Sequence, residues 1–180
     1  VTTIKTTNTR LPNKSFLHIN WKPLYRYLFK TLKSISEVDT YISSSDEEVL
    51  KIAQEWWFTP LKQPERLNHT SIAWDQLLEW VSTQIDYDLV GWLLITSPFL
   101  YKQTILNAIE IMKKWEYDSL IGVIPKYNRF WFDGKPVNHD PSNLIGTQFL
   151  IPVYEEADFY FINMKSFKKY KTRVCGKIYN

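Results

Sequence analysis

The chain has 180 residues, of which 22 are Lys or Arg and 19 are Asp or Glu, so its formal net charge is only +3. This length fits one domain with a single core, and a charge so close to balance excludes a surface that binds nucleic acid over its whole extent. No apolar run approaches the roughly 18 residues of a membrane span, and no secretory leader is visible. The lone cysteine, Cys175, cannot form an internal disulfide, so we expect a soluble cytoplasmic protein.

The opening of the chain predicts a strand, a cationic loop and then a helix. Residues 1–4 are mostly β-branched and suit a buried strand, and Lys5, Arg10 and Lys14 follow in a polar loop. In open α/β sheets, ligands bind beyond the carboxyl ends of the strands, so this loop is placed to hold phosphate. The alternative is a solvated loop with ordinary positive charge, because such charge runs are common.

The rest of the chain alternates helices with strands, the order that builds a mainly parallel sheet. Helices are expected at 23–36, from a capping box at 45–48 to about 58, at 70–85 and at 102–115, and strands at 38–43, 89–95, 119–124 and 158–164. The run Leu89–Ile95 is the most apolar and should be a central strand, buried on both faces. We therefore expect an α/β fold, a three-layer αβα domain doubly wound around a mainly parallel sheet.

Three segments depart from this alternation. Pro60 and Pro64 mark a connecting loop after the second helix. Residues 126–150 lack a sustained period and predict an inserted excursion with short strands, within a single domain of residues 1–180. The basic segment 165–171, together with Arg173, is expected to form a solvated face.

The cationic loop also carries a resemblance. The pattern Lys5-x4-Arg10-Leu11-Pro12-x-Lys14, followed by Lys22-Pro23-Leu24, resembles the opening A-R-x-G-S-K-R-L-P-x-K-N and G-K-P-L of the cytidylyltransferases that make CMP-activated acidic sugars, the CMP-N-acetylneuraminic acid synthetase family. Further similar blocks follow in the family's order at Tyr41–Glu48, Thr96–Pro98, Phe130–Asp140, Thr147–Glu156 and Arg173–Tyr179. The resemblance thus extends over the whole length of the chain.

Several positions differ from the family pattern. Thr7 stands in place of the loop glycine, so the backbone approaches phosphate less readily and side chains must do more of the binding. Thr9 replaces a lysine, Ser15 an asparagine, and Leu94 a glutamine that contacts sugar in the family. Gly146 occupies the place of an arginine that the family often uses for the sugar carboxylate, so either the sugar is unusual or Arg129 substitutes.

The resemblance implies a nucleotide-diphospho-sugar transferase-like fold and transfer of CMP from CTP to the anomeric hydroxyl of an acidic, sialic-acid-like sugar, with release of pyrophosphate. The implied site residues are Arg10 and Lys14 as catalytic groups, Lys5, Arg10, Lys14, Ser44 and Asp46 around the nucleotide, and Thr96, Asn138 and Gln148 around the sugar. Mg²⁺ is the implied cofactor, and the resemblance places its two aspartate ligands beyond Asn180. Family members usually pair through the excursion, which makes Phe130 and Trp131 the expected contact of a homodimer.

Two other functions remain as alternatives. The first is an inactive protein of the same fold that binds a nucleotide sugar without releasing pyrophosphate. The second is a single-stranded nucleic-acid binder that uses exposed aromatic rings and the basic tail, although the low net charge argues against it. The three histidines lack metal-ligand spacing, so the sequence predicts no metal site from them.

Overall fold

Most of the strands form one mixed, mainly parallel sheet in the computed structural model, which describes residues 1–7, 11–69 and 71–180. One ladder has the order β1 (Thr2–Thr3), β4 (Tyr41–Ser44), β5 (Thr59–Lys62), and the other has the order β11 (Ile178–Tyr179), β7 (Ser119–Lys126), β10 (Val153–Asn163), β6 (Leu89–Leu93). Val1 joins the two ladders: its amine donates to the Gly91 carbonyl at 2.6 Å, and its carbonyl accepts from the Leu93 amide at 3.0 Å. The strand order is therefore β5-β4-β1-β6-β10-β7-β11, and of these strands β10 runs antiparallel to its neighbours.

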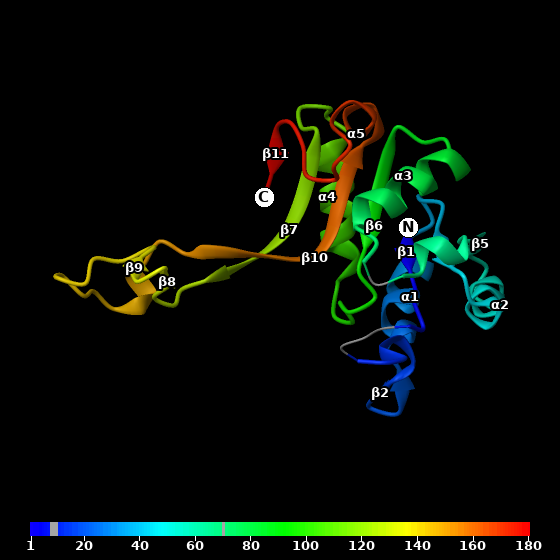
Figure 1. The fold of residues 1–180 in the computed structure, drawn as a ribbon, viewed down its shortest axis with the longest axis horizontal. Coiled ribbons are helices and arrows are strands. Elements are labelled where there is room, and N and C mark those ends of the chain that lie inside the picture. The colour runs from blue at the N-terminus through cyan, green and yellow to red at the C-terminus, as the bar shows by residue number, and fades with distance from the viewer. Residues whose placement is uncertain (8–10, 70) are drawn as a thin grey trace.

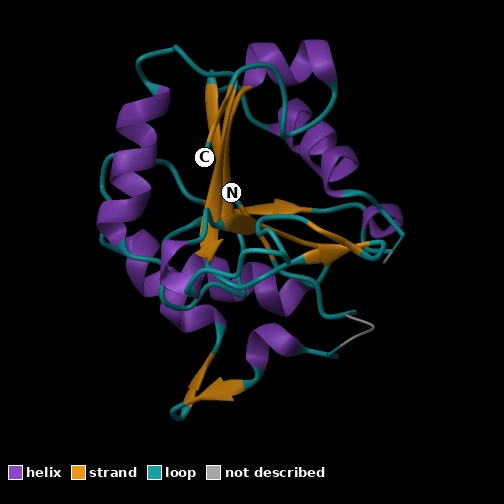
Figure 2. Ribbon diagram, turned by 90° about the vertical axis from the view of Figure 1, so that its left-hand side faces the viewer, coloured by secondary structure: helices purple, strands orange, loops and turns teal. Residues whose placement is uncertain are grey.

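Helices cover both faces of this sheet, as Figure 2 shows with the strands seen nearly edge-on. One core forms where α1 (Tyr25–Lys33), α2 (Glu47–Glu55) and α4 (Lys102–Met112) pack on the first face, and a second forms under α3 (Trp74–Gln84) and α5 (Met164–Tyr170) on the other. Alternate residues of β6 divide between them, Leu93 entering the first core and Trp92 the second. The three-layer, doubly wound prediction is confirmed, with β6 buried at the centre.

The segment between β1 and α1 differs from the expected single loop. It contains a 3₁₀ turn, η1 (Lys14–Phe16), and a hairpin of β2 (His18–Ile19) and β3 (Lys22–Pro23). Because Pro23 pairs with His18 in this hairpin, α1 begins at Tyr25 and not at Pro23. The spacing of Leu24, Leu28, Leu32 and Ile35 predicts one apolar helical face, and all four side chains are buried.

Two local predictions around α2 were wrong. The N-cap of this helix is Asp46, whose Oδ1 accepts from the amides of Glu48 at 2.9 Å and Val49 at 3.5 Å, so the cap lies one residue after the expected Ser45. The expected loop near Pro60 is the strand β5, followed by the short 3₁₀ turn η2 (Glu65–Leu67). Proline fits there because β5 is an edge strand, where an N–H that faces away from β4 needs no partner.

The basic segment after β10 was also interpreted incompletely. Residues Met164–Tyr170 form the helix α5, because Asn163 caps its first turn and Phe167 is buried against the sheet. Arg173 is not part of a solvated face. Its guanidinium Nη1 lies 3.0 Å from Asp75 Oδ1, and the side chain is mostly buried.

Residues 126–150 project from the body as a long arm (Figure 1). The outer halves of β7 and β10 lead into it, and it carries the hairpin of β8 (Trp131–Phe132) and β9 (Lys135–Pro136) and the 3₁₀ turn η3 (Thr147–Phe149). A bulge between Glu156 and Tyr160 marks the point where the ladder leaves the body. Opposite this bulge a side chain would not fit at Gly122, since a Cβ there would lie 2.5 Å from the Ala157 carbonyl oxygen.

Among the helices of the described residues, none combines the length and apolar character that crossing a membrane requires.

Candidate functional site

A cleft of about 250 Å³ lies where β1 and β6 end, next to the first turn of α3. Three predicted site residues line it together: Lys5, which follows β1, Lys14, which begins η1, and Thr96, which follows β6. β1 and β6 are parallel neighbours, so their carboxyl ends meet at the same edge of the sheet. The topology therefore brings the cationic loop and the Thr96–Pro98 block into one site, although 90 residues separate them in the sequence.

The two lysines of the cleft differ in their surroundings. Lys5 Nζ donates to the His69 carbonyl at 3.5 Å and lies 6.0 Å from the centroid of the Trp74 ring. Partial burial of this ammonium lowers the pKa of Lys5. Lys14 is half-buried, and its ammonium has no hydrogen bond or ion pair with any residue of the described ranges. The ammonium of Lys14 is therefore available to pair with an anionic ligand.

The chain conformation before η1 presents Lys14 to the cleft. Asn13 adopts a left-handed conformation with φ of 52°, which asparagine tolerates better than most residues, and its carbonyl accepts from the Phe16 amide at 2.8 Å. Ser15, the next residue after Lys14, is buried and also lines the cleft. This turn places Lys14 and Ser15 side by side at the cleft.

The wall of the cleft contains polar groups that the sequence analysis did not assign to a site. Thr3 Oγ1, Ser15 Oγ, Trp92 Nε1 and Arg173 Nε are all buried and have no hydrogen-bond partner among the described residues. Such atoms are uncommon in folded proteins and each one destabilises the unliganded state. Trp92 is a core residue, as expected for the central strand, and it also borders the cleft. Arg173 could have been found, since it begins the last block that resembles the family.

Ser44 and Asp46 lie near the cleft but do not line it. Ser44 Oγ donates to the Ile4 carbonyl at 2.7 Å and accepts from the Asp46 amide at 3.2 Å, while Asp46 caps α2. These contacts fix the end of β4 against the end of β1, directly beside Lys5. In this structure both side chains support the loop, and their predicted contacts with base and ribose stay a prediction.

The remaining predicted site residues lie elsewhere. Asn138 belongs to the arm, where its Oδ1 accepts from the Phe130 amide at 3.0 Å and its Nδ2 donates to the Ile151 carbonyl at 3.1 Å. Gln148 is exposed in η3, also on the arm. Arg129 donates from Nη2 to the Ile145 carbonyl at 2.6 Å, again within the arm. Arg10 lies outside the described residues.

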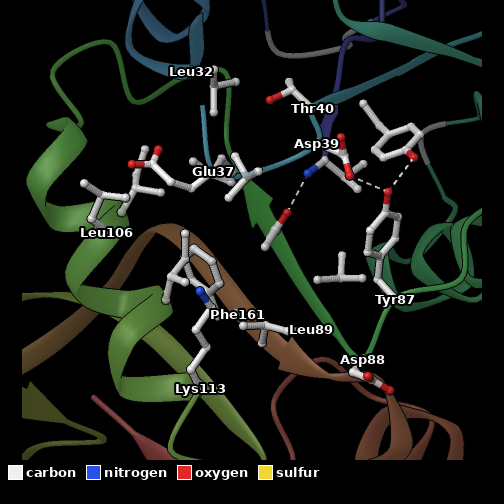
Figure 3. Close-up of a pocket in the computed structure, with 18 of the residues that line it drawn as sticks. Leu32, Glu37, Asp39, Thr40, Tyr87, Asp88, Leu89, Leu106, Lys113 and Phe161 are labelled. Carbon is white, nitrogen blue, oxygen red and sulfur yellow. Dashed lines mark hydrogen bonds between the residues drawn. The ribbon is translucent and has the colours of Figure 1, made fainter. Parts of the chain in front are cut away.

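A second cavity, of about 560 Å³, lies at the opposite edge of the sheet, where β4 and β6 begin (Figure 3). Its ionisable side chains are mainly carboxylates, namely Glu37, Asp39, Asp88 and Glu110, with Lys113 as the cationic side chain. Tyr87 donates to Asp39 Oδ2 at 2.7 Å, and this hydrogen bond raises the pKa of Tyr87. The amine of Val1 is buried at this cavity, and burial lowers its pKa to about 5. Although it is larger, this cavity is mainly acidic, so it suits an anionic ligand less well than the smaller cleft does.

The described residues bring together no group of three His, Cys, Asp or Glu side chains that could hold a metal ion. The resemblance places the Mg²⁺ ligands beyond Asn180, so the cofactor stays a prediction, and we assign no described side chain a role in holding it.

A doubly wound sheet with a cleft at the carboxyl ends of its strands places this chain among the α/β proteins that bind ligands at that edge of the sheet. A family model described as cytidylyltransferase matches residues 6–149. The chain belongs to the cytidylyltransferase family. The match begins one residue after Lys5 and includes the rest of the cationic loop with Lys14, as well as Thr96 and most of the arm.

Individual relatives agree with this assignment. The chain is 28% identical over 108 residues to N-acylneuraminate cytidylyltransferase A of Danio rerio, covering 58% of this chain and 25% of that protein. It is 22% identical over 143 residues to N-acylneuraminate cytidylyltransferase of Oncorhynchus mykiss, covering 74% and 33%. The chain thus matches between a quarter and a third of the length of these curated relatives.

Solved structures share the fold. A CMP:2-keto-3-deoxy-manno-octonic acid synthetase complexed with CTP has a TM-score of 0.72 at 12% identity, over 98% of this chain and 77% of that one. A 4-diphosphocytidyl-2C-methyl-D-erythritol synthase from Anaerococcus prevotii has a TM-score of 0.62 at 14% identity, over 94% and 74%. Since both identities are low, these structures support the fold and not a particular substrate.

Proposed function

We propose that the protein transfers CMP from CTP to the anomeric hydroxyl of an acidic, sialic-acid-like sugar and releases pyrophosphate. The observation that carries the proposal is the meeting of Lys5, Lys14 and Thr96 in one cleft at the carboxyl ends of β1 and β6. The family match and the N-acylneuraminate cytidylyltransferases among the relatives support the choice of CTP and of this sugar class.

The proposed reaction is an in-line displacement at the α-phosphorus. The sugar hydroxyl oxygen forms a bond to this phosphorus, the bond from the α-phosphorus to the bridging oxygen breaks, and the hydroxyl proton leaves to solvent. Negative charge accumulates on the departing pyrophosphate, so cations fixed near it stabilise the transition state. Lys14 is placed for this role because its ammonium is not neutralised by any described residue, and Lys5 adds a second positive charge.

The arm supports the further proposal of a homodimer. In the single chain, the surface of the arm exposes several large apolar side chains: Tyr127, Trp131, Phe132, Val137, Leu144, Ile145 and Phe149. An apolar surface of this kind marks a protein interface. A partner copy would also explain the position of Asn138 and Gln148: neither lines the cleft of its own chain, and we propose that the arm carries them to the sugar in the partner's cleft.

We place the reaction in the cytoplasm, because Cys175 is a buried free thiol that suits a reducing compartment. Two measurements test the function. Titration calorimetry should show CTP binding that exceeds ATP binding, and incubation with CTP, magnesium and N-acetylneuraminate should release pyrophosphate. Binding of CTP without release with any acidic sugar would favour the inactive alternative. Failure to bind CTP would contradict the nucleotide site itself.

A further inference from the structure

The lining of the cleft contains two chemically different sets of side chains. Lys5, Lys14 and Ser15 form a polar, cationic set, whereas the aromatic set consists of Trp74, Trp92 and Tyr160 with Arg173. The two sets meet where Lys5 Nζ lies 6.0 Å from the centroid of the Trp74 ring. The volume of about 250 Å³ lies below the roughly 300 Å³ at which pockets begin to hold a whole drug-sized ligand, so the cleft has room for only part of a large ligand.

The aromatic set comes from three elements and from the segment that follows α5. Trp74 is the first residue of α3, Trp92 lies in β6, Tyr160 in β10, and Arg173 follows α5. The Trp74 and Trp92 rings meet edge to face, with centroids 5.7 Å apart. Trp74 is 40% exposed, so part of its ring is available to a ligand.

The guanidinium of Arg173 is held in a fixed position. Asp75 Oδ1 accepts a hydrogen bond from Arg173 Nη1 at 3.0 Å and another from the Arg173 backbone amide at 3.1 Å. The central carbon of the Arg173 guanidinium lies 4.8 Å from the centroid of the Tyr160 ring. A guanidinium has five N–H donors in a planar fork, of which Asp75 accepts one, and Tyr160 is a second side chain that interacts with this group. The Nε–H has no partner among the described residues, as noted above. A preorganised arginine with spare donors suits a planar carboxylate.

We propose that Arg173 and Trp92 form the carboxylate subsite for the sugar substrate, with Arg173 pairing with the carboxylate, Trp92 Nε1 donating a hydrogen bond to the same group, and Trp74 packing against the apolar face of the sugar ring. This assignment rests on the proposed function and deepens it. Gly146 stands where the family often has an arginine for the sugar carboxylate, and Arg129 was one alternative for this role. Arg129 donates to the Ile145 carbonyl within the arm, whereas Arg173 lines the cleft. Trp92 and Arg173 then act as specificity-determining residues.

The experiment compares two sugars that differ only at the carboxylate. N-acetylneuraminate and its methyl ester are titrated into the wild type loaded with CTP, and tryptophan fluorescence reports sugar binding. The variants are Arg173→Gln, which removes the cation, and Trp92→Phe, which removes the indole N–H and keeps an aromatic ring. Lys171→Gln is the matched control, because Lys171 is an exposed cation that pairs with Glu79 at 2.9 Å and does not line the cleft.

The wild type and the control should bind the acid at least about tenfold more tightly than the ester, the size expected for one charge-assisted pair. Arg173→Gln should lose this preference, and Trp92→Phe should reduce it, while CTP affinity stays within about twofold of wild type. The proposal is overturned if Arg173→Gln retains the preference in a folded protein, if either variant weakens CTP as much as sugar, or if CTP-loaded wild type binds neither sugar. A wild type that fails to bind CTP would instead contradict the proposed function, and the calorimetric titration reveals that failure separately.

Discussion

Replacing Lys14 by alanine tests the nucleotide site most directly. The ammonium of Lys14 lines the cleft and has no partner in the described part of the chain, so its removal leaves no buried group unpaired. Loss of a charge-assisted hydrogen bond to phosphate costs about 1.5 to 3 kcal/mol. Because about 1.4 kcal/mol corresponds to a factor of ten, Lys14→Ala should weaken CTP binding by about ten- to 150-fold.

The same substitution should have little effect on folding. A lysine without a protein partner typically contributes within about 0.5 kcal/mol to stability, which for a chain of this size changes Tm by about 1 to 2 °C. Titration calorimetry with CTP gives the affinity and calorimetric melting gives Tm. Lys22→Ala serves as the control, because Lys22 is an exposed cation in β3 that does not line the cleft. Equal CTP affinities for wild type and Lys14→Ala would refute the assignment of Lys14 to the triphosphate.

Three further predictions concern assembly, packing and pH. Phe132→Glu, on the apolar surface of the arm, should convert a dimer to a monomer in sedimentation experiments at tens of micromolar; a wild type that is already monomeric would exclude pairing through the arm. Phe29→Ala should reduce the free energy of unfolding by about 3 to 5 kcal/mol in denaturant titrations, because this fully buried ring contacts Tyr25, Trp56 and Phe58; a loss below about 1 kcal/mol would contradict this core. In a chain that begins at Val1, the pKa of the terminal amine is 8.0 in the unfolded state and about 5 in the folded state. Between these two pH values the unfolded state therefore binds more protons than the folded state. The free energy of unfolding should rise by about 3 kcal/mol from pH 5 to pH 8. Denaturant titrations across this range should show the rise, and a chain extended by two alanines before Val1 should not show this part of it.

The sequence was sufficient to predict the architecture, because the spacing of apolar residues within one helix or strand indicates which of its faces is buried. The apolar run at 89–95 could only be a strand buried on both faces, and β6 is the central strand with Leu93 in the core. The helical spacing that placed Leu28 and Leu32 on one face was likewise sufficient for α1. Its start at Tyr25 was not predictable, since the pairing of Pro23 with His18 depends on a hairpin whose turn the composition does not signal.

Strand β5 shows a limit of local propensity. Pro60 predicts a loop, because proline lacks the N–H that a strand inside a sheet must donate. The tertiary structure reverses this prediction by placing the strand at the edge, beside β4, where the position of Pro60 faces away from the sheet. Whether a strand lies at the edge or at the centre depends on the order of all strands in the sheet, and a local sequence pattern does not contain this information.

The candidate site divides in the same way. Lys5 and Lys14 were predicted from the cationic loop after the first strand, and Thr96 from the resemblance to the family. The burial of Trp92 was predicted as well, but its position beside the cleft was not, because that position depends on neighbouring elements. Arg173 was expected on a solvated face, because its turn inward to Asp75 is not visible in a run of lysines. The order of the strands determines which side chains meet at their carboxyl ends, and this order is established by packing between residues far apart in the chain. The sequence by itself determined the positive charge of the loop after the first strand, and only the tertiary structure decided which aromatic and cationic groups line the cleft beside it.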